Sequence, residues 1–362
     1  MDYLLEELQI FLDSEIQEFN VVVMPDFFLD RLIHLDYHAK AFCKTLVEVV
    51  KRKGGSIDDI NQMELRGGNA VNTASALAAL HANVTPIVCT SKLGLKLMKF
   101  YLKPARIDLS HVKISSKASI TTAIEFETKK GRVNVMFRDV GSLANFGTHM
   151  LNGQDFEVIE NADYVCVFNW AGTRHFGTEL AETVFRCAKG NGKGKTYYDT
   201  ADPTTNEKKI PNLMKRILQT RQVDIFSINE NEAIYYSSQL DSEMEKPRKT
   251  LRFADSAKMS ARILAAHLPA RVDLHATDFS ATFTKKSETI VPAFKVPVLR
   301  VTGAGDAWNA GNILGDAHRL SEELRLALGN VIAAYYISNP KGTHPTQKQL
   351  SKFCKKLSTK LT

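Results

Sequence analysis

The sequence has few cysteines, and none of them lies in a pattern that would join it to another cysteine or to a metal. The chain of 362 residues contains five, an odd number, and no two form a C-x-x-C pair. This excludes a disulfide framework and a zinc knuckle and predicts a reducing compartment. The five are Cys43, Cys89, Cys166, Cys187 and Cys354.

Long apolar runs and a basic N-terminal segment are also missing. The first fifteen residues include several acidic ones and no Lys or Arg, and no stretch reaches the roughly 18 uninterrupted apolar residues that a membrane helix needs. We therefore expect a cytoplasmic protein with no membrane partner.

What is present is the composition of a large folded domain. Hydrophobic residues make up 44% of the chain and charged residues 24%, which is the usual globular balance and argues against disorder. We expect a single domain over residues 1–362. The net charge of +7 fits an anionic small molecule, a polyanion or simple solubility, so charge does not decide the function.

Apolar runs and helical periodicities alternate along most of the chain, which predicts an α/β fold. Strand, helix, strand in repeated order is typical of a parallel sheet covered on both faces, with ligands at the carboxyl ends of the strands. Expected strands are 21–24, 84–90, 163–169, 195–200, 223–228 and 272–276. Expected helices are 3–19, 69–81, 94–102, 178–189, 210–220, 255–267, 304–317 and 321–337. The first of these helices forms an N-terminal extension over residues 1–20.

One segment breaks this alternation. The β-rich runs 120–126 and 132–138 flank Lys129-Lys130-Gly131, which predicts a hairpin. A hairpin cannot lie inside a parallel sheet with helical crossovers, so we expect a small β lid built from about 31–66 and 118–140. The polar stretch 237–250 predicts an exposed loop.

The strongest chemical signal is Thr302-Gly303-Ala304-Gly305-Asp306 at the start of an expected helix. Small residues there let backbone N–H groups converge on one point, and the helix N-terminus favours an anion. A carboxylate beside such an anion hole repels phosphate but can accept a proton from an attacking hydroxyl. This pattern indicates phosphoryl transfer to an alcohol. The alternative is a tight turn in which Asp306 only starts the helix.

Two weaker signals could bind a polyol. In Arg66-Gly67-Gly68-Asn69-Ala70-Val71-Asn72, the glycines permit close approach and the two asparagines lie one helical turn apart. The alternative for this segment is a helix capped by Asn69. Asp26 and Asp30 follow the strand 21–24, where their carboxylates could accept from hydroxyls, although a solvated loop is the alternative for them.

Taken together, these motifs resemble the ribokinase-like (PfkB-type) carbohydrate kinases from Val21 to Thr346. The resemblance implies a three-layer α/β/α sandwich with a mainly parallel central sheet and a small β lid. It implies that Asp306 is the catalytic base and that Gly303, Ala304 and Gly305 form the anion hole. The positions that match the sugar-binding motifs are Asp30, Gly67, Gly68 and Asn72.

The same resemblance extends to the nucleotide. Asn229 and Glu232 match the N-x-x-E motif, in which the Asn lies near the phosphates and the Glu organises hydrated Mg²⁺. Asn330 matches a helix residue near the nucleotide base, with a plain polar surface position as its alternative. Thr277 is a candidate phosphate or ribose contact, whereas His275 is more simply a packed residue at a strand end.

Three departures limit what can be carried over. Arg300 stands where the pattern D-T-x-G-A-G-D has its acid, so a monovalent-cation site that depends on this acid does not carry over. The segment 274–280 contains no glycine where many members have two, so its nucleotide contacts must differ. The segment 36–55 is longer than the simple lid of the family. We interpret its basic end, Lys51-Arg52-Lys53, as a solvated helix end.

We therefore expect a Mg²⁺-dependent kinase that moves the terminal phosphoryl of ATP to a sugar, nucleoside or related polyol. The alternatives are a non-catalytic sugar-binding or nucleic-acid-binding protein on the same scaffold, and a kinase that uses ADP as donor. A lysine-rich C-terminal stretch could suit nucleic acid, but a surface helix packed on the domain is the preferred interpretation, and no nucleic-acid partner is expected. The resemblance also implies that lids can pair into a homodimer.

Overall fold

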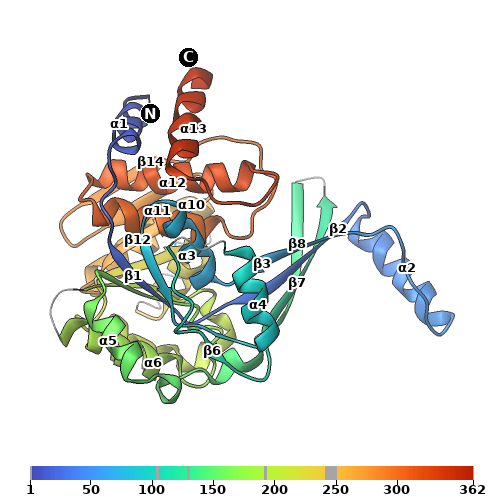
Figure 1. Ribbon diagram of the computed structural model, residues 1–362. Coiled ribbons are helices and arrows are strands. Elements are labelled where there is room, and N and C mark those ends of the chain that lie inside the picture. Colours follow the sequence, from blue (N-terminus) through green and yellow to red (C-terminus); the bar gives the residue numbers. More distant parts are fainter. Residues whose placement is uncertain (1, 103–105, 129–130, 191–193, 241–250, 362) are drawn as a thin grey trace.

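The computed structural model describes residues 2–102, 106–128, 131–190, 194–240 and 251–361 (Figure 1). Among these residues, eight strands form a central sheet in the order β14-β13-β12-β11-β10-β9-β1-β4. The strands from β12 to β4 run parallel, and β13 and β14 extend the sheet as antiparallel neighbours. Their bounds are β1 (Asn20–Met24), β4 (Asn83–Pro86), β9 (Tyr164–Phe168), β10 (Lys195–Asp199), β11 (Ile225–Asn229), β12 (Arg271–His275), β13 (Phe279–Phe283) and β14 (Glu288–Pro292).

Helices cover both faces of this sheet. One face carries α1 (Asp2–Asp13), α3 (Asn69–Ala79), α11 (Ala304–Ala317), α12 (Glu322–Ser338) and α13 (Gln347–Leu361). The other carries α5 (Gly153–Asn161), α6 (Gly177–Gly190), α7 (Ile210–Leu213), α8 (Glu230–Ser238) and α10 (Phe253–His267). The α/β/α sandwich expected from the sequence is therefore confirmed, and continuous apolar strands such as β9 are buried throughout because both of their faces are covered.

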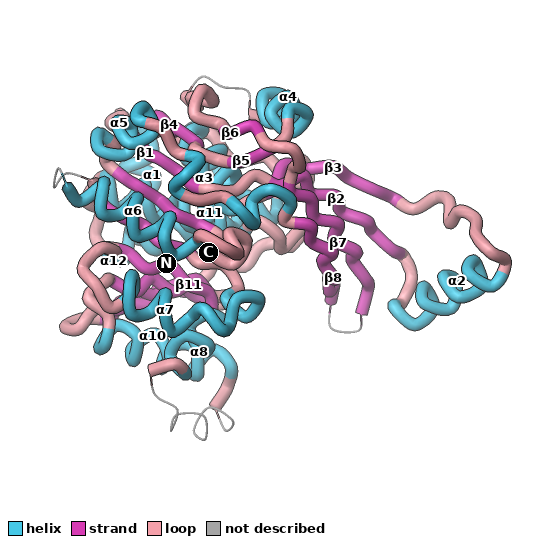
Figure 2. The backbone as a smooth tube through the Cα atoms, turned by 90° about the horizontal axis from the view of Figure 1, so that it is seen from below, coloured by secondary structure: helices cyan, strands magenta, loops and turns pink. Residues whose placement is uncertain are grey.

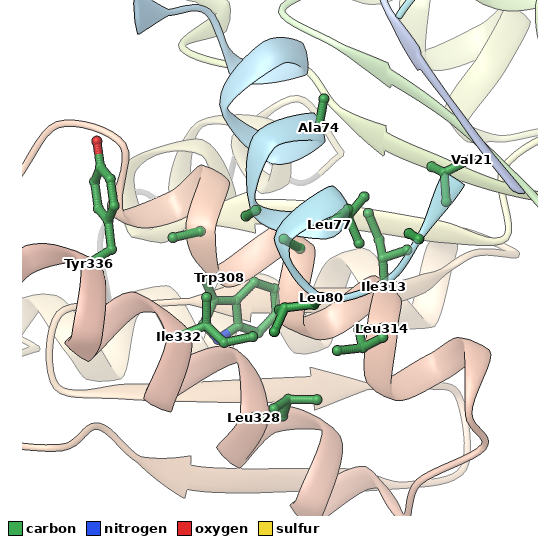
Figure 3. Packing of buried hydrophobic residues seen from close by; sticks show 14 of the residues in the cluster. Val21, Ala74, Leu77, Leu80, Trp308, Ile313, Leu314, Leu328, Ile332 and Tyr336 are labelled. Carbon is green, nitrogen blue, oxygen red and sulfur yellow. The ribbon is translucent and has the colours of Figure 1, made fainter. Parts of the chain in front are cut away.

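The core on the first face joins segments that are far apart in the sequence. Figure 3 shows Leu77 of α3 and Ile313 of α11 packed close together, with Ile332 of α12 beside Trp308. This packing brings the N-terminus of α3 and the N-terminus of α11 to the same region. Both helices start at motifs to which the sequence assigns chemistry.

A second, four-stranded sheet projects from the sandwich. Its order is β3-β2-β7-β8, and Figure 2 shows it at the side of the molecule, with α2 at its far end. The bounds are β2 (Phe28–Leu35), α2 (Ala39–Lys51), β3 (Asn61–Gly67), β7 (Ser119–Thr128) and β8 (Gly131–Asp139). The hairpin expected around Gly131 is present as β7 and β8. Lys129 and Lys130 lie outside the described residues.

The helix at the N-terminus is shorter than its periodicity indicates. It ends at Asp13, and the Ser14 hydroxyl donates to the carbonyl of Phe11 at 2.7 Å. Ile16 and Phe19 are nevertheless buried, because the extended chain that follows the helix lies on the same core. Ile16 and Phe19 were therefore correctly assigned to the core but wrongly to the helix, whereas the apolar residues up to Leu12 lie in α1 as expected.

Other boundaries differ for local reasons. The expected strand 84–90 is divided into β4 and β5 (Cys89–Thr90), and β5 pairs with β6 (Lys113–Ile114) beside α4 (Lys92–Tyr101). The expected helix 210–220 is a short α-helical turn, α7, followed by a π-helical turn over Met214–Leu218. The sequence analysis missed α5, α8, β6, β13 and β14. Of the expected loop 237–250, residues 237 and 238 belong to α8, and 241–250 lie outside the described residues.

The two ends of the described chain lie together (Figure 1). Ser351 of α13 donates to the carboxylate of Asp13 at the end of α1 at 2.6 Å, and Leu350 and Leu357 are buried. The lysine-rich C-terminal stretch is thus a surface helix packed on the domain, as expected. Among the described residues, no helix has the length and apolarity to cross a bilayer.

Candidate active site

The turn at Gly303 has the geometry of an anion hole. Gly303 has φ +87°, a left-handed conformation that side-chain-bearing residues rarely adopt. The N–H of Ala304 is used by the turn itself, because it donates to the carbonyl of Val301 at 3.2 Å. In the described part of the chain the N–H groups of Gly305 and Asp306 have no acceptor, so they are the open donors at the start of α11.

Asp306 joins the two strongest motifs of the sequence. Its carboxylate accepts from the Asn72 side-chain amide at 2.9 Å, and its backbone carbonyl accepts from the Thr73 hydroxyl at 3.3 Å. Burial raises the pKa of Asp306 well above its usual range, and the charge of Asp199 adds to this, while the bond from Asn72 opposes it. A carboxylate with a raised pKa is a stronger proton acceptor, which suits a general base.

Asp26 is a structural residue, so its interpretation as part of a solvated loop is wrong. Its side chain is fully buried and accepts from the backbone N–H groups of Asn69 and Ala70, each at 2.9 Å. It also accepts from the Asn169 side chain at 2.8 Å. Asp26 thus provides hydrogen-bond acceptors for the N–H groups of the first turn of α3. This helix begins after Gly68, whose φ is +93°. Asn69 is therefore held by Asp26 rather than acting as the cap itself.

Asp30 lies within strand β2, not in a loop. Burial raises its pKa to about 6, which the Thr121 hydroxyl bond and the charge of Arg138 oppose. Among the described residues its Oδ1 has no hydrogen-bond partner. Burying a carboxylate oxygen without a hydrogen-bond donor is unfavourable, so a ligand hydroxyl that donates to Asp30 Oδ1 would supply the missing hydrogen bond.

The lid sheet aligns further side chains with Asp30. Asp30 of β2, Thr121 of β7 and Arg138 of β8 are register partners, so they form one row across three strands. Leu32, Ala123 and Met136 form the next row toward the tip of the lid. The Arg138 guanidinium lies 5.2 Å from the centroid of the Phe28 ring. Sequence reasoning did not find Thr121 or Arg138, because their alignment depends on strand register.

These groups surround a cavity of about 340 Å³ between the lid and the carboxyl ends of the central strands. Of the residues predicted from the sequence, the cavity brings together Asp30, Gly68, Asn72, Asn229, Glu232, Gly303, Gly305 and Asp306. Gly67 does not line it but lies directly behind Asp30. A cavity is thus present at the carboxyl edge of the sheet, where the sequence analysis places the ligand site.

Asn229 and Glu232 form a reciprocal cap at the start of α8. The Asn229 side chain accepts from the Glu232 N–H at 3.0 Å, and its amide group donates to Glu232 Oε1 at 2.8 Å. Burial raises the pKa of Glu232 well above its usual range, and the charge of Asp199 adds to this. Asp199 ends β10, and Asp202 follows it into the same cavity. The sequence analysis missed both, although their position after a strand was a usable signal.

The residues of this region suit a Mg²⁺ ion that is bound through water molecules and substrate phosphates rather than directly by several side chains. Among the described residues, no group of three or more His, Cys, Asp or Glu side chains is arranged to hold a metal ion directly. Mg²⁺ commonly keeps several waters and binds through one or two carboxylates together with substrate phosphates. Asp199, Asp202 and Glu232 are carboxylates of the kind that such a hydrated ion requires.

A second cavity, of about 790 Å³, lies on the other side of the turn. Asn229, His275 and Gly305 line both cavities, so the anion-hole turn stands between them. Thr277 and Asn330 also line this second cavity. The Asn330 side chain is held by Trp308 Nε1, which donates to it at 3.1 Å, and the Thr277 N–H donates to Glu230 at 2.8 Å.

His275 occupies the boundary between the two cavities. Its ring lies 5.2 Å from that of Trp308, and a Cβ atom at Gly305 would come within 3.0 Å of it. Burial lowers the pKa of His275 to about 4, so the ring is neutral at pH 7. Its Nε2 has no partner among the described residues. A packed strand-end residue, as expected from the sequence, therefore also faces the site.

Comparison with known proteins settles the family. The model of the pfkB family of carbohydrate kinases matches residues 45–349. The chain belongs to this family. No curated protein matches the sequence of this pfkB-family chain.

Solved structures show the same fold at low sequence identity. Arabidopsis thaliana ribokinase, complexed with ribose and ATP, has a TM-score of 0.67 and 17% identity over 94% of this chain and 99% of that one. Adenosine kinase from Sinorhizobium meliloti has a TM-score of 0.69 and 16% identity over 94% and 99%. Ribokinase from Cryptococcus neoformans var. grubii serotype A, in complex with ADP, has a TM-score of 0.68 and 14% identity over 92% and 99%. The pfkB-family chain thus has the ribokinase fold.

Proposed function

We propose that this pfkB-family protein phosphorylates an alcohol group of a sugar, nucleoside or related polyol, with ATP as donor. The observation that carries the proposal is the position of Asp306. Its carboxylate, with a raised pKa, lines the cavity beside the open N–H groups of Gly305 and Asp306. A base and an anion hole at one point are what transfer of a phosphoryl group to a hydroxyl needs.

The acceptor would bind in the cavity under the lid. The Asp30 carboxylate accepts hydrogen bonds from its hydroxyls, and the Asn72 side chain, already bonded to Asp306, has its Oδ1 without a partner in the described chain. Gly68 leaves room for close approach to the backbone. The row of Asp30, Thr121 and Arg138 provides polar contacts, and Leu32, Ala123 and Met136 provide an apolar wall.

In the transfer step, the acceptor hydroxyl oxygen attacks the terminal phosphorus of ATP, and the bond from that phosphorus to the ADP oxygen breaks. The hydroxyl proton passes to Asp306. The amides at the start of α11 stabilise the negative charge on the transferring group. Closure of the lid over the cavity excludes water, which would otherwise consume ATP by hydrolysis.

The nucleotide would occupy the second cavity, near Thr277 and Asn330, with its phosphates directed toward Asn229 and the turn. Asp199, Asp202 and Glu232 would hold Mg²⁺ through its water shell. The ion would neutralise part of the phosphate charge.

The test is a ligand screen followed by product detection. The protein is heated with Mg²⁺ and a nonhydrolysable ATP analogue in the presence of nucleosides, pentoses, hexoses and their phosphates, because a true acceptor raises the Tm by mass action. Compounds that raise it are then incubated with ATP or with ADP, and the phosphorylated product is measured by mass spectrometry. We expect a product with ATP. Product with ADP alone would support the ADP-dependent alternative, and binding without any product would support a non-catalytic protein.

We also propose that the lid pairs two copies of the chain. β8 is an edge strand of the lid sheet, and Val133, Val135 and Phe137 on its outer face are about half exposed. Two such edges in antiparallel contact would pair each other's edge backbone groups and bring the two apolar stripes side by side. A second copy of the chain is therefore the partner that we propose for this surface.

A further inference from the structure

Two arginines lie behind the anion-hole turn, and neither has a carboxylate partner in the part of the chain that the structure describes. Arg300 is 7% exposed, and one of its terminal nitrogens donates to the carbonyl of Pro340 at 2.8 Å. Arg66, at the end of β3, contacts His344 Nδ1 at 2.8 Å. Within the described ranges, Nε of Arg66 and both Nε and Nη1 of Arg300 are buried without an acceptor. Burying unpaired guanidinium groups is costly, so their position calls for a role.

A continuous stack connects Arg300 to the turn. The Arg300 guanidinium lies 5.8 Å from the centroid of the Tyr336 ring, and this ring stacks on His344 at 4.7 Å. The hydroxyl edge of Tyr336 packs against Gly303, where a Cβ atom would lie 2.9 Å from the ring. Figure 3 shows Tyr336 projecting from α12. The ring of Tyr336 therefore lies between the charge of Arg300 and the turn at Gly303, whose amides we propose to bind phosphate.

Arg66 lies within electrostatic reach of the same site. Burial lowers the pKa of Arg66, Tyr336 and the carboxylate of Asp306 oppose this, and the charge of Arg300 adds to it. Arg66 and Arg300 therefore act as a pair on one side of a site that is otherwise rich in carboxylates. Such a pair offsets the negative charge of Asp306 and Asp30 when phosphates arrive.

The space between these groups is too small for a free anion. The void that they share with Asp30, Asn72 and Thr302 measures about 10 Å³, which is about one water molecule. Arg300 also lines the nucleotide cavity, on the far side of the void. Its guanidinium fills the loop at Gly342, where a Cβ atom would come within 1.9 Å of Nη1. The positive charge of Arg300 is thus a fixed part of the wall of the second cavity.

The residues present do not fit a monovalent cation here. Such an ion needs oxygen ligands, whereas this region presents guanidinium N–H groups, and the Pro340 carbonyl already accepts from Arg300. The family pattern has an acid at position 300, and this chain has the opposite charge there. The charge at position 300 is thus positive where the family pattern has a negative one.

We propose that Arg300, with Arg66 beside it, is a built-in positive charge that supports phosphate binding at the Gly303–Gly305 turn and makes the protein independent of K⁺ and Na⁺. This inference rests on the proposed function, since it assumes that nucleotide phosphates bind at the turn. Arg300 is a positioning residue rather than a catalytic one, because it acts on the phosphate through Tyr336 and the turn.

The test measures nucleotide affinity and therefore needs no acceptor. Binding of ADP with Mg²⁺ is measured by calorimetry in KCl, NaCl and choline chloride at equal ionic strength. We expect the wild-type Kd to agree within about twofold across the three salts. Arg300→Gln should weaken binding by about 10- to 100-fold, and Arg300→Lys by less. Arg186→Gln, which removes an exposed arginine of α6, is the matched control and should bind as the wild type does.

A rescue experiment separates charge from structure. Guanidinium chloride at tens of millimolar should tighten ADP binding by Arg300→Gly but not by the wild type, and a purely structural role would show no such rescue. A wild-type Kd at least tenfold tighter in KCl than in choline chloride would overturn the inference, as would unchanged binding by a folded Arg300→Gln variant. Absence of nucleotide binding by the wild type in every salt would instead refute the proposed function, and the inference with it.

Discussion

Gly67 of β3 and Asp30 of β2 are diagonal neighbours on adjacent strands, so close that a Cβ atom at position 67 would lie 2.1 Å from Asp30 Oδ2. The glycine of β3 is therefore required by the carboxylate of β2. Sequence similarity assigns both residues to sugar binding, but only one of them lines the cavity. Gly67 acts by leaving room for Asp30 to keep its position.

Gly67→Ala should consequently displace Asp30 and destabilise the lid. We expect a loss of about 1–3 kcal/mol in the free energy of unfolding, measured by chemical denaturation, together with weaker acceptor binding. Gly153→Ala is the matched control, because a Cβ atom there has nothing within 4 Å. Adding Asp30→Ala to Gly67→Ala should restore most of the lost stability. If the double variant is no more stable than Gly67→Ala, the clash is not the cause.

Asp30 should make stability depend on pH in a defined direction. Its pKa in the folded protein is about 6, above that of an unfolded aspartate near 4. Its contribution to stability is present below pH 4 and is lost as pH rises through 6. The advantage of Asp30→Asn over the wild type should therefore grow between pH 4 and pH 7, to about 2–3 kcal/mol. Thermal denaturation across this range tests it, with the exposed Glu6→Gln as control for the change of charge.

Glu232 combines a structural and a proposed metal role, and two variants separate them. Glu232→Gln keeps a side-chain oxygen for the cap of α8, whereas Glu232→Ala loses the cap and about 1 kcal/mol of stability. Both should need several-fold more Mg²⁺ for half-maximal turnover. If Glu232→Gln has the wild-type Mg²⁺ requirement, Glu232 serves only as a cap.

The lid edge should control oligomeric state. Val133→Lys combined with Val135→Lys places two charges on the proposed contact and should convert a dimer to a monomer in light scattering. Ile10→Lys, at an exposed apolar position on α1, is the control. A wild-type protein that is monomeric at tens of micromolar would contradict the pairing.

Local patterns allowed the sandwich and the turn at Gly303–Gly305 to be predicted from the sequence. The small residues at 303–305 predict a turn into a helix wherever they occur, because only short-range sterics are involved. The bond between Asn72 and Asp306 spans 234 positions and depends on how α3 packs on α11. Similarity to a family assigned both residues to the site but did not predict the bond between them.

The site residues that the sequence analysis missed or misjudged depend on strand register and on contacts between distant parts of the chain. Arg138 lies on a strand that was expected, but its alignment with Asp30 follows from the pairing of three strands. Asp26 resembles a loop residue in sequence, since the backbone groups that it caps are more than 40 positions away. Arg300 was noticed as a departure, but its contact with Tyr336 needed the fold.

The most direct test of the account compares product formation by the wild type and Asp306→Asn. Each protein is incubated with ATP, Mg²⁺ and the acceptor identified in the screen, and the phosphorylated product is measured over time by mass spectrometry. We predict that Asp306→Asn retains its fold and its nucleotide affinity but forms product about 10² to 10⁴ times more slowly. Product formation by Asp306→Asn at the wild-type rate would contradict the role of Asp306 as the base.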